Sequence, residues 1–286
     1  MSNHFIKNIE IKNFKCFENF KAEGFGRVNL IGGKNNVGKT AFMEAIYLIN
    51  PKKDLNFLIR MRYISDILLD LWDEIGKKFI NNFIKAKVEA YQNYEIKTNL
   101  VKLEKNIIFK SSNKSTKTNY DTYYGKIIEN ALEDKVDDYI KEFDNSIDKF
   151  RIIKSQPHCQ KNGNFYNINE FGEGLGKFIS LILLVLSSKD TILLIDEIDN
   201  GIHYSNLDKL WEIILKISIE QKVQVFATTH SKECIESYAR VAKKLEDEEI
   251  SFIELCKRED EIKAFVYPYD WFIDEIEQEH EVRGCL

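Results

Sequence analysis

The spacing of apolar residues predicts strands and helices that alternate along most of the chain. Residues 6–14 alternate between apolar and polar side chains, and a similar stretch begins at residue 19, which favours antiparallel strands near the N-terminus. Residues 28–31 form a short, mainly apolar strand that ends at two glycines. Over residues 40–49 apolar side chains recur at helical spacing, and Pro51 ends the predicted helix.

In the second half of the chain, apolar runs without alternation predict strands that are buried on both faces. The predicted elements are a turn and an apolar helix at 172–186, a strand at 191–195, a helix at 207–219, a strand at 223–227, a helix at 231–244, a strand pair at 251–256 and 264–267, and a helix at 271–279. Strands that alternate with helices indicate an α/β fold with a mostly parallel core sheet.

The middle of the chain has a different pattern and predicts a lobe inserted into this core. We expect a helix over 55–72, exposed antiparallel strands within 79–119, and an amphipathic helix, broken or continuous, over 127–147. The predicted organisation is therefore one core formed by 1–51 and 151–286, with an α+β or helical lobe at 52–150.

Composition narrows the class of protein. Hydrophobic residues make up 44% and charged residues 30% of the 286 residues, which is typical of a globular chain. No apolar run reaches the roughly 18 residues of a membrane span, and residues 1–15 lack the apolar segment of a signal peptide, so we expect a cytoplasmic protein. The cysteines form no CxxC pair, which predicts reduced structural thiols. They are Cys16, Cys159, Cys234, Cys256 and Cys285.

The turn after the strand at 28–31 fits the P-loop pattern G-x-x-x-x-G-K-[ST]. Its residues are Gly33, Lys34, Asn35, Asn36, Val37, Gly38, Lys39 and Thr40, followed by Ala41. The glycines let backbone N–H groups converge on phosphate oxygens, and the following helix directs its positive end at the same anion. Lys39 is predicted to pair with the β and γ phosphates of ATP, and the Thr40 hydroxyl to bind Mg²⁺.

Acidic residues and a histidine follow the two buried strands. Parallel strands bring their carboxyl ends to one edge of the sheet, where ligands of open α/β sheets bind. Asp196 is predicted to hold Mg²⁺ through water, and Glu197 to polarise the attacking water. His230 follows the strand at 223–227, and we predict that it contacts the γ-phosphate.

A second glycine-rich turn precedes the apolar helix at 172–186. Gly172, Glu173 and Gly174 leave backbone N–H groups at a helix start, which is a second candidate anion site. A structural glycine turn explains these three residues equally well.

The order of these motifs resembles the ABC-type P-loop ATPases of the SMC-like and OLD (overcoming lysogenization defect) group, among AAA_15/AAA_21-like ATP-binding proteins without a TOPRIM domain. Residues 9–17 resemble the family's first strand and turn, residues 33–40 resemble its Walker A motif, and residues 193–197 resemble its Walker B motif. Sequence motifs of the OLD-like branch are resembled at 200–203, 225–231 and 279–284. The resemblance covers both ends of the chain and omits most of 52–150.

The resemblance implies an ATP-dependent homodimer in which two copies face each other around two ATP molecules. Each P-loop would be completed by the partner's signature loop, in which Gly172 stands where the family has a serine. No TOPRIM segment follows the last predicted helix, so the chain itself is not expected to cut DNA. The resemblance implies that it works with a separately encoded effector, such as a TOPRIM-type or other nuclease in phage defence.

Three functional hypotheses follow: an ATPase switch, a non-hydrolysing scaffold that uses ATP to assemble with a partner, and the nucleotide-binding subunit of a transporter. The inserted lobe and the signature without serine disfavour the third. The net charge of −5 gives no overall sign of a nucleic-acid binder. Clustered lysines in the predicted lobe fit either a solvated face or a DNA-binding surface. They are Lys77, Lys78, Lys85, Lys87, Lys97, Lys102, Lys105, Lys110, Lys114 and Lys117.

Overall fold

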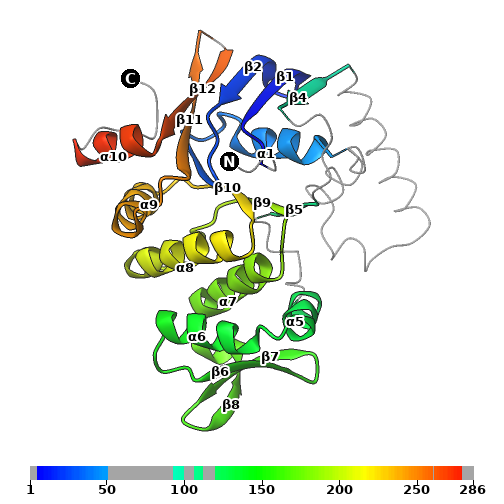
Figure 1. Ribbon diagram of the computed structural model, residues 1–286, viewed down its shortest axis with the longest axis vertical. Helices are drawn as coiled ribbons and strands as arrows, with labels where there is room; N and C mark the ends of the chain where they lie inside the picture. Colours follow the sequence, from blue (N-terminus) through cyan, green and yellow to red (C-terminus); the bar gives the residue numbers. More distant parts are fainter. Residues whose placement is uncertain (1–4, 51–92, 100–105, 112–119, 260, 279–286) are drawn as a thin grey trace.

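The computed structural model describes residues 5–50, 93–99, 106–111, 120–259 and 261–278 (Figure 1). Its centre is a six-stranded sheet in the order β12-β11-β3-β10-β9-β5. The strands are β3 (Val28–Gly32), β5 (Ile107–Lys110), β9 (Ile192–Ile195), β10 (Gln224–Thr228), β11 (Ile250–Arg258) and β12 (Glu261–Pro268). All neighbours pair in parallel except β12, which is antiparallel to β11. The predicted mostly parallel core sheet is therefore confirmed.

One face of this sheet is covered by helix α1 (Lys39–Leu48) and a three-stranded antiparallel sheet in the order β2-β1-β4. The strands of that sheet are β1 (Asn8–Phe14), β2 (Phe17–Glu23) and β4 (Glu95–Thr98). Successive residues of a strand point to opposite faces, so Ile31, Leu194 and Phe226 join the apolar cluster on this side. The P-loop helix is thus held between two sheets.

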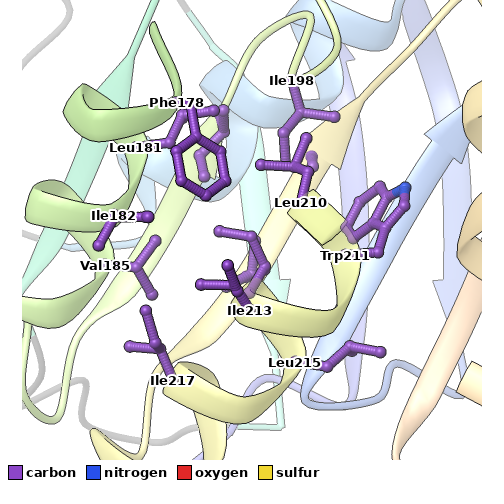
Figure 2. Close-up of a cluster of buried hydrophobic side chains, with 14 of the residues drawn as sticks. Phe178, Leu181, Ile182, Val185, Ile198, Leu210, Trp211, Ile213, Leu215 and Ile217 are labelled. Atoms are coloured by element: carbon purple, nitrogen blue, oxygen red, sulfur yellow. The ribbon is translucent and has the colours of Figure 1, made fainter. Parts of the chain in front are cut away.

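The opposite face is covered by α7 (Glu173–Leu186), α8 (Leu207–Glu220), α9 (Lys232–Leu245) and α10 (Tyr269–Glu277). Figure 2 shows the apolar side chains of α7 and α8 turned toward each other, with Phe178 and Ile182 of α7 near Leu210 and Ile213 of α8. All four side chains are at most 1% exposed. Truncation of such a side chain to alanine costs about 2–5 kcal/mol, so this layer strongly stabilises the packing of α7 against α8.

A lobe of two helices and a second antiparallel sheet packs on α7, away from β1 and β2 (Figure 1). Its elements are α5 (Tyr120–Glu129), α6 (Glu133–Phe143), β6 (Lys149–Ile153), β7 (Gln156–Lys161), β8 (Asn164–Asn167) and the short 3-10 helix η1 (Ile168–Phe171). Phe143 stacks on Phe178 with ring centroids 3.6 Å apart. The amphipathic helix predicted over 127–147 is broken, because Ala131 takes a left-handed φ of 51° between α5 and α6.

Two strands correct the predicted boundaries of the inserted lobe. Both β4 and β5 fall within 52–150, but β4 pairs with β1 and β5 pairs with β9. The alternating and apolar patterns of these short segments show that they are strands but do not show which strands they join. Conversely, β6–β8 follow the predicted boundary at 151 but belong to the lobe. The helix predicted over 55–72 lies outside the described residues, as do residues 79–92, 100–105 and 112–119 of the segment predicted to form exposed strands.

Two predictions from composition can be compared with the structure. Cys16, Cys159 and Cys234 have free thiols, but Cys256 is disulfide-bonded, so the prediction of reduced thiols is wrong for that residue. Spacing along the chain cannot report which sulfur atoms the fold brings together. Among the described residues, no helix is long and apolar enough to cross a membrane.

Candidate nucleotide-binding site

The P-loop begins where the buried strand β3 ends, and two of its glycines cannot be replaced without a clash. Gly33 has a φ of 136° and Gly38 has a φ of 88°. Residues that carry a Cβ atom rarely adopt these backbone conformations. A Cβ at Gly33 would overlap the carbonyl oxygen of Leu255, and one at Gly38 would lie 2.7 Å from the Cys16 Sγ. The close approach of β11 and of the β1–β2 turn therefore explains why glycine occupies both positions.

The start of α1 has the features of an anion site. Gly38 is its N-cap, and no side chain caps the first turn. The N–H groups of an uncapped first turn are directed along the helix axis toward any anion placed there. Lys39 is 6% exposed, and its Nζ donates hydrogen bonds to the carbonyl oxygens of Gly33 at 2.7 Å and Lys34 at 2.8 Å. The ammonium group is thus held over the loop.

The P-loop lies close enough to the acids at the end of β9 for their charges to act on the Lys39 ammonium. Burial lowers the pKa of Lys39 to about 8, and the charges of Asp196 and Glu197 oppose this shift. The residues predicted as Walker A and Walker B, far apart in the sequence, therefore meet in one electrostatic environment.

Asp196 is placed by two neighbouring strands. Its backbone N–H donates to the carbonyl oxygen of Lys110 at the end of β5 (2.9 Å), and its Oδ1 accepts a hydrogen bond from the Thr228 Oγ1 (2.8 Å). The four residues of β9 are buried, so the strand delivers the half-buried Asp196 to the carboxyl edge of the sheet. This is the position that the sequence predicts for a Mg²⁺-binding carboxylate.

Glu197 lies in a turn with an unusual backbone conformation. Its φ of 50° is left-handed, which costs a residue other than glycine about 1 kcal/mol or more. Its N–H donates to the Thr228 Oγ1 (2.8 Å), and its Oε2 accepts a hydrogen bond from the Asn200 Nδ2 (3.2 Å). The Lys177 Nζ of α7 donates to the Asn200 Oδ1 (3.2 Å), so Asn200 links the helix after the signature loop to Glu197.

His230 lies at the same edge, two residues after the end of β10. Burial, followed by the nearby charge of Lys39, lowers the pKa of His230, while the charges of Glu197, Asp199 and Asp196 oppose the shift. A pKa below the ordinary 6.5 leaves the imidazole neutral at pH 7, and a neutral imidazole offers one donor and one acceptor nitrogen. The structure therefore brings His230 into the neighbourhood of Lys39 and Glu197.

The candidate signature loop lies beside the turn that follows Glu197. A Cβ at Gly174 would lie 3.2 Å from the carbonyl oxygen of Gly201, and Gly172 and Glu173 are exposed. Gly172 has a φ of 87° and a ψ of 164°, a region that is essentially restricted to glycine. The backbone at this position thus excludes a serine, which accounts for the departure from the family pattern.

Several residues of the site carry roles that the sequence did not indicate. Three such residues contact the predicted acids or each other: Thr228, Asn200 and Lys177. In the sequence, only their position beside a motif or a strand end could have pointed to these roles. Lys110 was grouped with the lysines of a possible DNA surface, but burial lowers its pKa and its Nζ donates to the Ser180 Oγ at 3.1 Å. Lys97 is exposed and pairs with Glu95. The other lysines of that group lie outside the described residues.

The residues predicted to bind Mg²⁺ supply oxygen ligands only. Thr40 lies in the first turn of α1, and Asp196 directly follows β9. One strand, β10, separates β9 from β3 in the sheet. Mg²⁺ is usually held by one or two protein oxygens together with phosphates and water. Within the described ranges no group of three or more His, Cys, Asp or Glu residues could hold a metal alone. The donor set fits Mg²⁺ bound together with a nucleotide.

Comparison with known proteins identifies the family. Residues 62–236, more than half of the chain, match the family described as "AAA domain, putative AbiEii toxin, Type IV TA system". The chain belongs to this family. This AAA-domain protein is 22% identical to the ATP/GTP phosphatase of Helicobacter pylori over 95% of its own length and 97% of that protein. A shorter match, 37% identical over 24% of the chain, is to the DNA replication and repair protein RecF of Bacillus cytotoxicus, of which it covers 17%.

The solved structures that are similar show the same fold. The SMC head bound to the C-winged helix domain of ScpA superposes with a TM-score of 0.55 at 15% identity, covering 92% of this chain and 98% of that one. The SMC head domain from Thermotoga maritima gives a TM-score of 0.51 at 14% identity, with the same coverage. The AAA-domain protein therefore has the fold of an SMC head domain.

Proposed function

We propose that this AAA-domain protein binds ATP with Mg²⁺ at the carboxyl edge of its core sheet, and that two copies close around two ATP molecules. The observation that carries the proposal is the meeting of Lys39, Asp196, Glu197 and His230, each of which alters the electrostatics of another. These residues come from the ends of three strands, and such convergence of charges at the edge of an open α/β sheet is the usual arrangement of a ligand site.

Each residue has a role that its environment supports. Phosphate oxygens would replace the carbonyl partners of the Lys39 ammonium, and hydrogen bonds that involve a charged group contribute about 1.5–3 kcal/mol. The Thr40 hydroxyl and the Asp196 carboxylate would hold Mg²⁺, which neutralises charge on the phosphates. Glu197 accepts a proton from water as the water oxygen bonds to the γ-phosphorus. The bond from that phosphorus to the β–γ bridging oxygen then breaks, and His230 donates a hydrogen bond to the γ-phosphate.

The exposed signature loop supports the dimer. Gly172, Glu173 and Gly174 present the uncapped N-terminus of α7 to solvent, and a γ-phosphate held by a second copy is the anion that fits it. A homodimer with two shared sites would use both anion-binding turns of each chain. One of the SMC heads to which the chain is similar was solved bound to the C-winged helix domain of ScpA.

The replacement of Glu197 by Gln tests this function. Glu197→Gln should retain ATP binding and lose at least about 100-fold in turnover, because the amide cannot accept the proton of water. In ATP and Mg²⁺ the variant should elute as a dimer by size exclusion with light scattering, and as a monomer without ATP. Glu129→Gln, at an exposed position of α5, is the matched control. A Glu197→Gln protein that stays monomeric at saturating ATP would contradict the proposal.

A second candidate is a scaffold that assembles on ATP without hydrolysing it. Gly172 favours it, because glycine has no hydroxyl group and the backbone conformation at this position disfavours a serine. Phosphate release separates the two candidates: the scaffold predicts equal and negligible rates for the unchanged protein and for Glu197→Gln.

We further propose that the closed dimer regulates a separately encoded effector, such as a TOPRIM-type or other nuclease, with a role in phage defence. The family description names a putative toxin of a toxin–antitoxin system, and this supports a role together with a second, separately encoded protein. Tagged Glu197→Gln protein in ATP should co-purify with the effector, whereas Lys39→Ala protein should not. ATP turnover with and without DNA, at several salt concentrations, tests DNA as a further ligand.

A further inference from the structure

Two consecutive threonines end strand β10, and both are buried: Thr228 is 1% exposed and Thr229 is fully buried. The Thr228 Oγ1 accepts a hydrogen bond from the Glu197 N–H and donates one to the Asp196 Oδ1, both at 2.8 Å. The Thr228 carbonyl oxygen accepts a third hydrogen bond from the N–H of Ile198 (3.0 Å). One residue therefore holds both the carboxylate predicted to bind metal and the backbone of the predicted general base.

Thr229 makes a parallel set of contacts one residue later. Its Oγ1 donates to the Asp199 Oδ1 (2.7 Å) and accepts from the N–H of Ser231 (3.0 Å). Ser231 is the N-cap of α9, and the Thr229 N–H donates to the carbonyl oxygen of Ile31 in β3 (3.1 Å). His230 lies between Thr229 and Ser231, which both make these hydrogen bonds, so the backbone of His230 is fixed on both sides.

The chemistry of these contacts requires a hydroxyl group. A hydroxyl donates one hydrogen bond and accepts others at the same time, whereas valine, of nearly the same shape, can do neither. The left-handed backbone of Glu197 is stable only while neighbouring groups hold it, and the Thr228 hydroxyl accepts the hydrogen bond of the Glu197 N–H. Loss of the Thr228 hydroxyl would also remove the hydrogen bond that it donates to the Asp196 Oδ1.

We propose that Thr228 and Thr229 are positioning residues for ATP hydrolysis. Thr228 orients the Asp196 carboxylate and the Glu197 backbone. Thr229 fixes the backbone of His230 relative to Asp199, which lies in the turn after β9. The inference rests on the proposed function, because it assigns these threonines to the hydrolytic roles of Asp196, Glu197 and His230. Neither threonine touches the nucleotide in this scheme.

The test compares Thr228→Val and Thr229→Val with Thr228→Ser and Thr229→Ser, which keep the hydroxyl. Thr228→Val should lower kcat about 10–100-fold and raise the Mg²⁺ concentration at half-maximal rate about tenfold, as for other partners of metal ligands. Thr229→Val should lower kcat about tenfold without a change in Mg²⁺ dependence. Each serine variant should be within about threefold of the unchanged protein, and KM for ATP should change less than about threefold in all four.

Thr191→Val is the matched control, because Thr191 is 5% exposed and lies at the opposite end of β9, where its hydroxyl donates to the Lys189 carbonyl oxygen. It should leave kcat and the Mg²⁺ dependence unchanged. A threonine-to-valine effect of equal size at all three positions would assign the loss to general destabilisation and overturn the inference. Unchanged kcat and Mg²⁺ dependence in Thr228→Val would also overturn it.

Two further measurements keep the result clear. If Thr228→Val does not bind labelled ADP, Thr228→Cys takes its place, and an unchanged kcat and Mg²⁺ dependence of that variant would overturn the inference. If Glu197→Gln turns over ATP as fast as the unchanged protein, the proposed function itself fails. If Glu197→Gln is inactive and both valine variants are fully active, only the inference about the threonines fails.

Discussion

The two ends of the core sheet are both rich in polar groups, but only one end directs them outward. At the amino edge, Arg27 is 5% exposed and pairs with Asp247, while its Nε donates to the Ser218 Oγ (3.0 Å). Gln224, fully buried there, uses its amide to bind the backbone of Ile6 and Gly26. These groups bind one another, so this edge contributes to stability.

At the carboxyl edge the same strands end in glycine turns, acids and a histidine. Among the described residues, the Lys39 ammonium donates hydrogen bonds to the loop carbonyls of Gly33 and Lys34, and the helix behind it has no side-chain cap. Polar groups that a fold pairs internally hold the fold together, whereas groups that converge without a full set of protein partners are suited to a ligand. The comparison predicts that substitutions at the two edges separate stability from nucleotide binding.

The largest effect is expected from Arg27→Ala at the amino edge. Removal of one partner from a buried ion pair leaves Asp247 charged and buried, which lowers the free energy of unfolding by about 3–5 kcal/mol. Denaturant titration measures this change, and ATP affinity of the folded fraction should be unaltered. Arg240→Ala breaks the exposed pair with Asp208 and should cost about 1 kcal/mol or less. Equal losses for both would contradict the comparison.

Lys39→Ala should show the reverse behaviour. ATP affinity should fall about 100-fold, which corresponds to the loss of one or two charge-assisted hydrogen bonds. The melting temperature should be unchanged or higher, because burial disfavours the charged form of Lys39. Equilibrium binding of a fluorescent ATP analogue measures the affinity, and Lys189→Ala, exposed near the amino edge, is the control. Tight ATP binding by Lys39→Ala would remove the P-loop from the proposal.

A smaller effect is expected from pH. The pKa of Lys39 is about 8 without nucleotide, and phosphate favours the protonated form, so binding above pH 8 requires uptake of a proton. ATP affinity should therefore fall about tenfold between pH 7 and pH 9. Calorimetry in buffers of different ionisation enthalpy would show this proton uptake at pH 9, and an affinity that is flat over this range would show that Lys39 stays fully charged.

The smallest effect is expected from Asn200→Ala. This change removes the hydrogen bond to the Glu197 Oε2 and the contact with Lys177, so kcat should fall about three- to tenfold with little change in KM. Steady-state phosphate release measures both constants. Asn130→Ala, an exposed asparagine whose side chain donates to the Lys126 carbonyl oxygen, should have no effect.

Much of the fold was predictable because its strongest signals are local. The buried runs that became β9 and β10, and the helix capped by Ser231, need only periodicity and capping chemistry to be recognised. The P-loop was predictable because its glycines meet strict conformational demands at Gly33 and Gly38. The positions of the acids and of His230 at the carboxyl edge were predictable because they follow buried strands within two residues, whereas their roles stay predictions.

What the sequence could not reveal depends on contacts between distant segments. The pairing of β5 with β9 joins a short strand from the middle of the chain to the core, and nothing in four residues specifies that neighbour. The same holds for Lys110, whose burial follows from that pairing, and for Cys256, whose disulfide depends on the fold. The contacts of Thr228 and Thr229 also depend on the fold, because they form only where β10 lies beside β9.

The position of β5 gives the Walker B turn a mechanical connection to the middle of the chain. The last carbonyl group of β5 holds the Asp196 amide, and the side chains of Ile107 and Ile108 lie on opposite faces of the sheet. A slip of one residue along β9 would exchange those faces and withdraw the carbonyl from the amide. A molecule that pulled on this edge strand could therefore disturb the metal-binding turn from a distance, without entering the nucleotide site.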